Sequence, residues 1–470
     1  MRLRHLVVVV PGIAGSRLES ERGPAWEVRL GSVASSVLRP AALSLNEQLY
    51  PAGPTPTGTL PWLGRVHSLG RLTKNIGDRF PGTVVDVCHY QQARNPRADV
   101  VVFSYDFRRS VRQTAERLAA EIDARLAGLG ADARAGRVVV VAHSMGGLVA
   151  RYWLGPLGGW KVCRALVTLG TPHRGAPKAL DWLVNGPPVL RTVRRELADE
   201  ARAVLAEWDS MYELLPRYPA IRDVTEDTER DPGTAEPRLL YPYELPGLGG
   251  RARAAFAVHE EIERGWAEIP PQRVPEVVPV FTRGHATFTH AELDDTQLTL
   301  SKSDAGWLPN PGWKGDSTVP AISAIPVELS ELKAGWTADT RRHLALPSTP
   351  LVAAKLLDFT GDSLASVRGT DTPDEPWIGL DLDDLHPAGE PLTVQASLEG
   401  IPESAAASLF ARITSSDGLL GPRLRMEADG DAWTITLPPG PAGSYEVEVR
   451  AVIPGRNDVV CTDTIGLVAP

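Results

Sequence analysis

Cysteine and long apolar runs are both scarce in this chain. The 470 residues include only three cysteines, too few and too scattered for a disulfide framework or a metal site: Cys88, Cys163 and Cys461. No run approaches the roughly 18 consecutive apolar residues that a membrane-spanning helix needs. The apolar stretch at residues 6–10 is too short for a signal peptide and runs directly into Pro-Gly. We therefore expect a first strand there and a cytoplasmic protein.

Positive charge is also in deficit. The net charge is −9, which argues against nucleic acid or an anionic membrane surface as the main partner. Residues 371–470 contain 17 acidic and 5 basic residues, a balance of −12, so the rest of the chain carries +3. The end of the chain therefore differs chemically from what precedes it, and the length is typical of two domains.

One stretch, residues 137–150, combines the signals of a strand, a tight turn and a helix. Four valines, 138–141, are typical of a buried parallel strand. The run Ala-His-Ser-Met-Gly that follows is a G-x-S-x-G pattern with Ala142 in place of the first glycine, and Ser144 at its centre. Such a turn exposes its serine at the top of a sheet. A serine in an ordinary turn remains the alternative, and the partner residues must decide.

Strand and helix patterns alternate through residues 1–368, which predicts an α/β domain: a mostly parallel sheet covered by helices on both faces. Two stretches interrupt the pattern, and we interpret them as lid or cap insertions: residues 20–82 and 182–275. Within them Trp62, Leu63 and Trp182 are candidates for apolar contact with a substrate chain. A purely structural role in the core is the alternative for each of these side chains.

From residue 372 to 470 the pattern changes to short strands separated by turn residues, typical of a C-terminal all-β, immunoglobulin-like sandwich. An Asp/Glu/Pro-rich linker near residues 371–376 indicates few contacts across the boundary. We therefore expect a chain ending near Arg368 to fold and to keep its activity.

A serine hydroxyl needs a base in contact with it and an acid that orients the base. In enzymes with this kind of turn the chain order is serine, acid, histidine. Six histidines follow Ser144, but His386 lies in the sandwich and His259 lies in a helical pattern of the lid. His173, His285 and His290 precede the best acid candidate. That leaves His343, 27 residues after Asp316 in a Gly-Asp-Ser-Thr-Val loop. A solvated loop carboxylate is the alternative role for Asp316.

The oxyanion of an acyl-transfer reaction also needs backbone donors. One is expected to be the N–H of Met145, the residue after the nucleophile. The other is expected from the first strand-to-helix loop, where Ile13 follows Pro11 and Gly12. His173 comes too early in the chain to be the base, and we expect it to pack beside the serine turn.

Five motifs in this order resemble the lecithin:cholesterol acyltransferase and phospholipase family of α/β-hydrolases, particularly its bacterial lipase-like members. They are the loop at 11–19, Tyr-Asp-Phe-Arg at 105–108, Ala-His-Ser-Met-Gly-Gly at 142–147, Thr-Pro-His-Arg-Gly at 171–175 and Gly-Asp-Ser-Thr-Val at 315–319. The resemblance covers about residues 5–365. It implies that Ser144, Asp316 and His343 form the triad and that Ile13 and Met145 supply the oxyanion donors. Unlike the family's secreted members, this chain has no cysteine in the insertion after the first loop.

The sequence thus predicts a serine esterase, lipase or O-acyltransferase that works through an acyl-serine intermediate and needs no cofactor or metal. Its expected partner is a lipid or other ester, with transient contact to a lipid surface and no nucleic acid. A catalytically weak hydrolase-fold protein, whose sandwich binds a partner not identified by the sequence, is the alternative. The sequence does not separate hydrolysis from acyl transfer.

Overall fold

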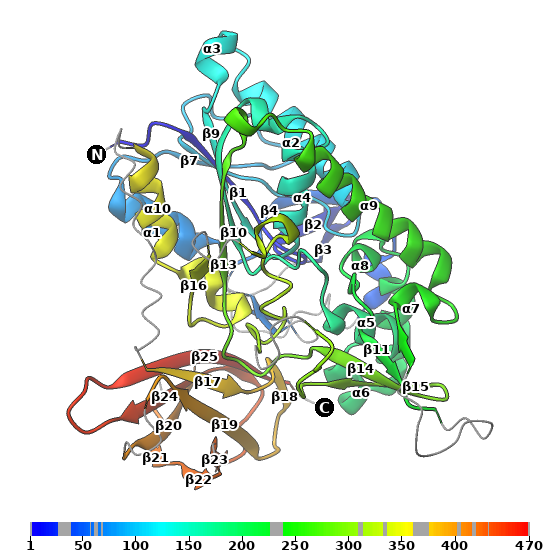
Figure 1. Cartoon of the computed structure of the whole chain (residues 1–470), viewed down its shortest axis with the longest axis vertical. Helices are drawn as coiled ribbons and strands as arrows, with labels where there is room; N and C mark the ends of the chain where they lie inside the picture. Colours follow the sequence, from blue (N-terminus) through cyan, green and yellow to red (C-terminus); the bar gives the residue numbers. More distant parts are fainter. Residues whose placement is uncertain are drawn as a thin grey trace.

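The computed structural model describes the chain in two bodies, an α/β part and a β part below it (Figure 1). The described residues are 2–26, 39–56, 58–60, 64–66, 69–225, 238–308, 314–331, 336–360, 376–401, 406–415, 420–430 and 432–468. Within these ranges, no helix combines the length and the apolar character needed to cross a membrane. The linker predicted at 371–376 lies, up to residue 375, outside them.

A seven-stranded sheet forms the centre of the α/β part, and each of its neighbouring pairs is parallel. The strand order is β16-β13-β10-β9-β1-β8-β7. The strands are β1 (Leu6–Val10), β7 (Val85–Val87), β8 (Val100–Val102), β9 (Val138–His143), β10 (Cys163–Leu169), β13 (Glu276–Phe281) and β16 (Thr337–Ala338). This sheet confirms the predicted α/β-hydrolase class, and β9 lies at its middle.

Helices cover both faces of this sheet (Figure 1). One face packs on α1 (Gly70–Arg79) and α10 (Leu351–Thr360); the other packs on α2 (Val111–Arg125), α4 (Met145–Leu154) and α9 (Gly249–Ala267). Because side chains alternate along a strand, Val139 and Val141 face α1 and α10, while Val138 and Val140 face the other layer. The four-valine run is therefore buried on both sides, as a central parallel strand requires.

The two predicted insertions contain small elements of their own. The first, together with the four residues before it, forms a three-stranded sheet, a hairpin and a short 3-10 helix: β2 (Ser16–Ser20), β3 (Gly23–Trp26), β4 (Tyr50–Pro54), β5 (Gly58–Leu60), β6 (Gly64–Val66) and η2 (Pro40–Leu43). The second begins within α5 (Pro177–Val184) and contains α6 (Pro188–Val193), α7 (Arg195–Leu205) and α8 (Asp209–Glu213). A four-stranded sheet that the sequence did not predict joins β11 (Ile221–Asp223) and β12 (Arg238–Leu240) to β14 (His290–Asp294) and β15 (Gln297–Ser301).

The β part consists of two sheets that enclose one apolar core, as predicted. The first sheet contains β17 (Trp377–Asp381), β19 (Leu392–Glu399), β22 (Glu427–Asp429) and β23 (Ala432–Leu437). The second contains β18 (Leu385–Pro387), β20 (Ser408–Ser415), β21 (Leu424–Arg425), β24 (Gly443–Val452) and β25 (Val459–Val468). The pairings are antiparallel except that of β18 with β25.

The expectation that few contacts cross between the two parts is wrong. A Cβ on Gly284, in the loop after β13, would collide with the ring of Trp377 on β17. The Leu380 N–H donates to His285 Nδ1 at 3.0 Å, and the Leu380 carbonyl accepts from Ala286 N–H at 3.1 Å. The composition of a linker indicates how the linker itself behaves. It carries no information about the contacts that residues outside the linker make between the two parts.

Candidate active site

Ser144 lies at the turn between β9 and α4 with a backbone that few residues other than glycine adopt. Its φ is 53° and its ψ is −130°. The turn is fixed on both sides, because Ser144 N–H donates to the Leu169 carbonyl and Gly147 N–H donates to the Ser144 carbonyl, each at 2.9 Å. Such strain persists only where the surroundings enforce it, and it is common at functional sites. The strand, turn and helix are those predicted from the sequence.

Glycines allow the first loop and the serine turn to pack backbone against backbone. A Cβ on Gly12 would come 2.7 Å from Ser144 Cβ. A Cβ on Gly146 would come 2.6 Å from the Val10 carbonyl oxygen and still closer to that of Pro11. Neither position has room for a methyl group. The close packing of the first loop on the serine turn therefore explains why glycine occupies positions 12 and 146.

We expect Gly146→Ala to lower kcat/KM for a soluble ester by at least about tenfold and to destabilise the fold by about 1–3 kcal/mol, since overpacking against backbone forces the loop to move. Ester turnover and thermal unfolding measure the two effects. Gly128→Ala is the matched control, because a Cβ there meets no atom within 4 Å. Wild-type turnover in Gly146→Ala would contradict the tight contact.

The structure brings Ser144, His343 and Asp316 together in one hydrogen-bonded chain. His343 Nδ1 lies 2.7 Å from Asp316 Oδ2, and His343 Nε2 lies 2.9 Å from Ser144 Oγ. The other carboxylate oxygen of Asp316 accepts the N–H groups of Thr318 at 3.0 Å and Val319 at 2.7 Å. These bonds leave Oδ2 facing the imidazole, which favours the tautomer with the proton on Nδ1 and a free lone pair on Nε2.

The backbone of His343 is anchored as well as its ring. Its N–H donates to the Asp316 carbonyl at 2.8 Å. Its own carbonyl lies 2.9 Å from His143 Nε2, and the His143 ring centroid lies 4.9 Å from that of His343. His143 thus joins the serine turn to the loop of the base. The sequence analysis did not single it out, although its place directly before Ser144 was a usable signal.

Two other buried histidines, His259 and His285, bond their ring nitrogens to groups outside the candidate triad. His259 Nε2 lies 2.7 Å from the Glu213 carbonyl, and burial lowers the pKa of this histidine to about 3. His285 bonds the Thr340 carbonyl through Nε2 at 2.8 Å and accepts from Leu380 through Nδ1. Burial and the nearby Arg342 lower the His285 pKa to about 4. His173 is buried with Leu148 and Arg151 of α4, beside the serine turn as predicted. None of the three lines the pocket at Ser144.

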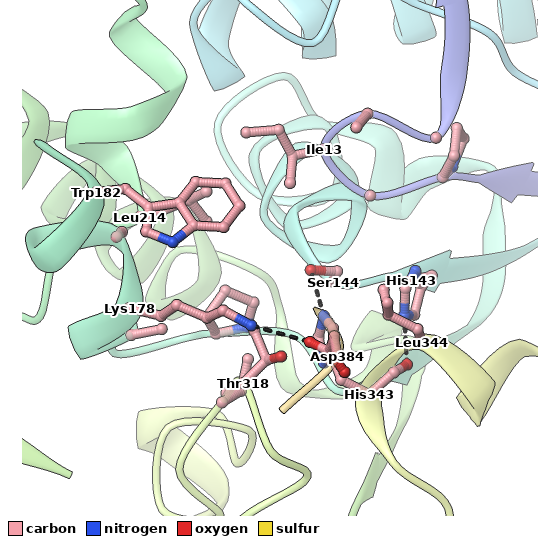
Figure 2. Close-up of a pocket in the computed structure, with 18 of the residues that line it drawn as sticks. Ile13, His143, Ser144, Lys178, Trp182, Leu214, Thr318, His343, Leu344 and Asp384 are labelled. Carbon is pink, nitrogen blue, oxygen red and sulfur yellow. Dashed lines mark hydrogen bonds and ion pairs between the residues drawn. The ribbon is translucent and has the colours of Figure 1, made fainter. Parts of the chain in front are cut away.

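A cavity of about 100 Å³ opens at Ser144 (Figure 2). Ile13 of the first loop and Trp182 of α5 line it, together with other apolar side chains: Leu69, Ala179, Met211, Leu214 and Val319. Met145 is the first residue of α4, a position whose N–H has no acceptor within the helix. The candidates Trp62 and Leu63 lie outside the described residues.

Two charged residues that the sequence analysis missed also line this cavity. Lys178 Nζ of α5 lies 3.0 Å from Asp384 Oδ2, which comes from the sandwich, beside Ser144 and His343 (Figure 2). Burial acts to raise the pKa of the Asp384 carboxyl, but the charges of Lys178, Arg342 and His343 outweigh it and hold the pKa below its usual range. No sequence motif marks either residue. Among the described residues, no cluster of three or more His, Cys, Asp or Glu could hold a metal ion.

The sequence has no match among the curated proteins. Of solved structures, it is similar to the lipase BlEst2 of Bacillus licheniformis. The mature form is 13% identical, with 76% of this chain and 92% of the lipase chain covered, at a TM-score of 0.36. The propeptide form is 10% identical, with 98% of this chain and 93% of the lipase chain covered, at a TM-score of 0.38. CopC from Methylosinus trichosporium OB3b is 19% identical over 20% of this chain and 95% of its own, with a TM-score of 0.17.

Residues 85–223 match the sequence model of the lecithin:cholesterol acyltransferase family. The matched range begins at β7 and includes the Ser144 turn, but it ends before Asp316 and His343. Together with the parallel sheet and the serine turn, this match confirms the resemblance of the chain to the lecithin:cholesterol acyltransferase family that its motifs predict.

Proposed function

We propose that this chain is a serine hydrolase or O-acyltransferase that acts on carboxylic esters through an acyl-serine intermediate. The hydrogen-bonded chain from Asp316 through His343 to Ser144, at the base of an apolar cavity, carries the proposal. Ser144 is the nucleophile, His343 is the general base and Asp316 orients the imidazole. The family match, which indicates lipase- or acyltransferase-like chemistry, supports the same class of reaction.

The proposed reaction has two halves. Ser144 Oγ attacks the ester carbonyl carbon while its proton moves to His343 Nε2, and the tetrahedral intermediate then breaks its bond to the alcohol oxygen, which takes that proton. Water or a second alcohol then attacks the acyl-serine while its proton moves to the same nitrogen. The bond from the acyl carbon to Ser144 Oγ breaks, Oγ takes the proton back from His343 Nε2, and the acid or a new ester is released. Asp316 stabilises the imidazolium that forms in each half.

The oxyanion of the tetrahedral intermediate is proposed to accept from the N–H groups of Ile13 and Met145. Gly12 brings the first loop against Ser144, so the Ile13 backbone adjoins the nucleophile. The N–H of Met145 is at the start of α4, where the helix dipole also favours negative charge.

The apolar lining supports an apolar acyl group, as in a lipid ester. Chromogenic esters of increasing acyl length, assayed with and without an added alcohol, would measure both the length preference and the share of acyl transfer. A fluorophosphonate should label Ser144. If neither labelling nor turnover of any ester occurs, the proposal fails and a binding role on a hydrolase scaffold is favoured.

Trp182 contributes its side chain to the cavity from α5. We expect Trp182→Ala to lower the ratio of kcat/KM for a dodecanoate ester over a butanoate ester by about tenfold, because a long chain loses more apolar contact than a short one. Trp160→Ala is the matched control, since Trp160 is half-buried and does not line the cavity. An unchanged ratio would show that Trp182 does not contact the acyl chain.

A further inference from the structure

A second, larger cavity adjoins the one at Ser144. Its volume is about 400 Å³, and it shares Lys178, Trp182 and Asp384 with the first. The ion pair between Lys178 and Asp384, drawn in Figure 2, lines both cavities and therefore lies where they meet. Since Asp384 belongs to the sandwich, the second cavity is closed partly by the C-terminal part of the chain.

The lining of the second cavity is rich in charges that are already neutralised. Each of its basic side chains is paired with a carboxylate: Lys178 with Asp384 at 3.0 Å, Arg191 with Asp181 at 2.9 Å, Lys302 with Asp381 at 2.6 Å, and Arg342 with Asp384 at 3.2 Å. A phosphate or carboxylate ligand would have to displace one of these partners. A hydroxyl group, in contrast, can donate to a carboxylate and accept from the adjacent cation at once.

Two further features of the cavity suit a neutral polyhydroxy ligand. The aromatic side chains of Trp182 and Phe288 line it and offer apolar surface to the C–H faces of a sugar. Ser317, directly after Asp316, also lines it, and the buried Ser317 hydroxyl has no hydrogen-bond partner among the described residues. Its φ of 82° is unusual for a residue with a side chain, and such strain is typical of functional positions.

We propose that the second cavity binds the alcohol part of the ester, and that this alcohol is a neutral sugar or polyol. The inference rests on the proposed function, because it places the acyl group in the apolar cavity at Ser144 and the leaving alcohol beyond Lys178 and Asp384. A carbonyl at Ser144 then has its acyl substituent in the more apolar cavity and its alcohol substituent in the cavity with more charged side chains. The sandwich takes part in substrate selection through Asp384.

Two butanoate esters of matched shape test the proposal: 6-O-butanoyl methyl glucoside and cyclohexylmethyl butanoate. Both carry a six-membered ring on a CH₂–O group. The glucoside ring contains an oxygen atom and carries hydroxyl and methoxy groups, which the cyclohexyl ring lacks. We expect the wild-type enzyme to favour the glucoside ester by at least about tenfold in kcat/KM, since a site built to bind hydroxyl groups rejects the analogue that lacks them. Equal rates, or a preference for the cyclohexyl ester, would overturn the inference and leave the proposed function intact. Turnover of neither ester, with no fluorophosphonate labelling, would instead overturn the proposed function.

Lys302→Met locates the effect. Lys302 lines the second cavity and not the first, and methionine keeps most of its apolar stem. The ratio of kcat/KM for the glucoside ester over the cyclohexyl ester is expected to fall about tenfold, because the variant loses one charged hydrogen bond to the ligand. Lys74→Met, at an exposed lysine on α1, is the matched control and should leave the ratio unchanged. An unchanged ratio in Lys302→Met would place the alcohol elsewhere and overturn the inference.

Discussion

Ser144→Ala and His343→Ala are each expected to lower kcat/KM for a soluble 4-nitrophenyl ester by at least about a thousandfold. Ser144→Ala removes the atom that forms the acyl intermediate, and His343→Ala removes the ring nitrogen that lies 2.9 Å from Ser144 Oγ. Because the two groups act as one unit, the double variant should be hardly slower than either single variant. Steady-state kinetics on each purified variant, with thermal unfolding to verify the fold, measures this.

His386→Ala is the control for the histidine variant. His386 lies on β18 of the sandwich and does not line the cavity at Ser144, so its loss should leave turnover near the wild-type rate. His343→Ala with more than about a tenth of wild-type activity would show that another group takes the Ser144 proton. An additive double variant would show that the two residues do not act in the same step.

The serine turn was predictable because its signal is local. A strand buried on both faces needs consecutive apolar residues, here four valines, and the tight turn needs small residues near Ser144. Both requirements are readable within ten residues. The choice of His343 and Asp316 needed only the order of the motifs along the chain. The structure places these three side chains in contact, although 199 residues separate Ser144 from His343.

Lys178 and Asp384 could not be found in the same way. Asp384 belongs to an acidic run in the sandwich sequence, which by itself is typical of a solvated loop. Its place beside His343 depends on how one domain packs on the other, and the partners in this contact are 206 residues apart. The sheet formed by β11, β12, β14 and β15 was missed for a related reason. β11 pairs with β14, which is about seventy residues away in the sequence, so no local pattern links the two strands.

A chain that ends at Arg368 is expected to be insoluble, or to lose more than about tenfold in kcat/KM, in contrast to what the linker composition predicts. Arg342, the residue directly before His343, is buried and donates to Asp463 and to the Leu382 carbonyl, both in the sandwich. Removal of the sandwich leaves the buried Arg342 guanidinium without the Asp463 carboxylate and the Leu382 carbonyl. Breaking a buried ion pair costs about 3–5 kcal/mol, and here the cost falls on the loop that carries the base.

Asp463→Asn in the full-length chain isolates this contact from the rest of the interface. The variant keeps the shape of the side chain but not its charge, so we expect lower thermal stability and a partial loss of kcat/KM with the sandwich still in place. Asp458→Asn is the matched control, because Asp458 pairs with Arg450 at the partly exposed end of the same sheet. A soluble chain of residues 1–368 with kcat/KM within about threefold of the full-length value would show that the Arg342 loop holds His343 without the sandwich. If Asp463→Asn instead lowers thermal stability and kcat/KM as expected, the C-terminal part supports catalysis by holding the loop that carries His343.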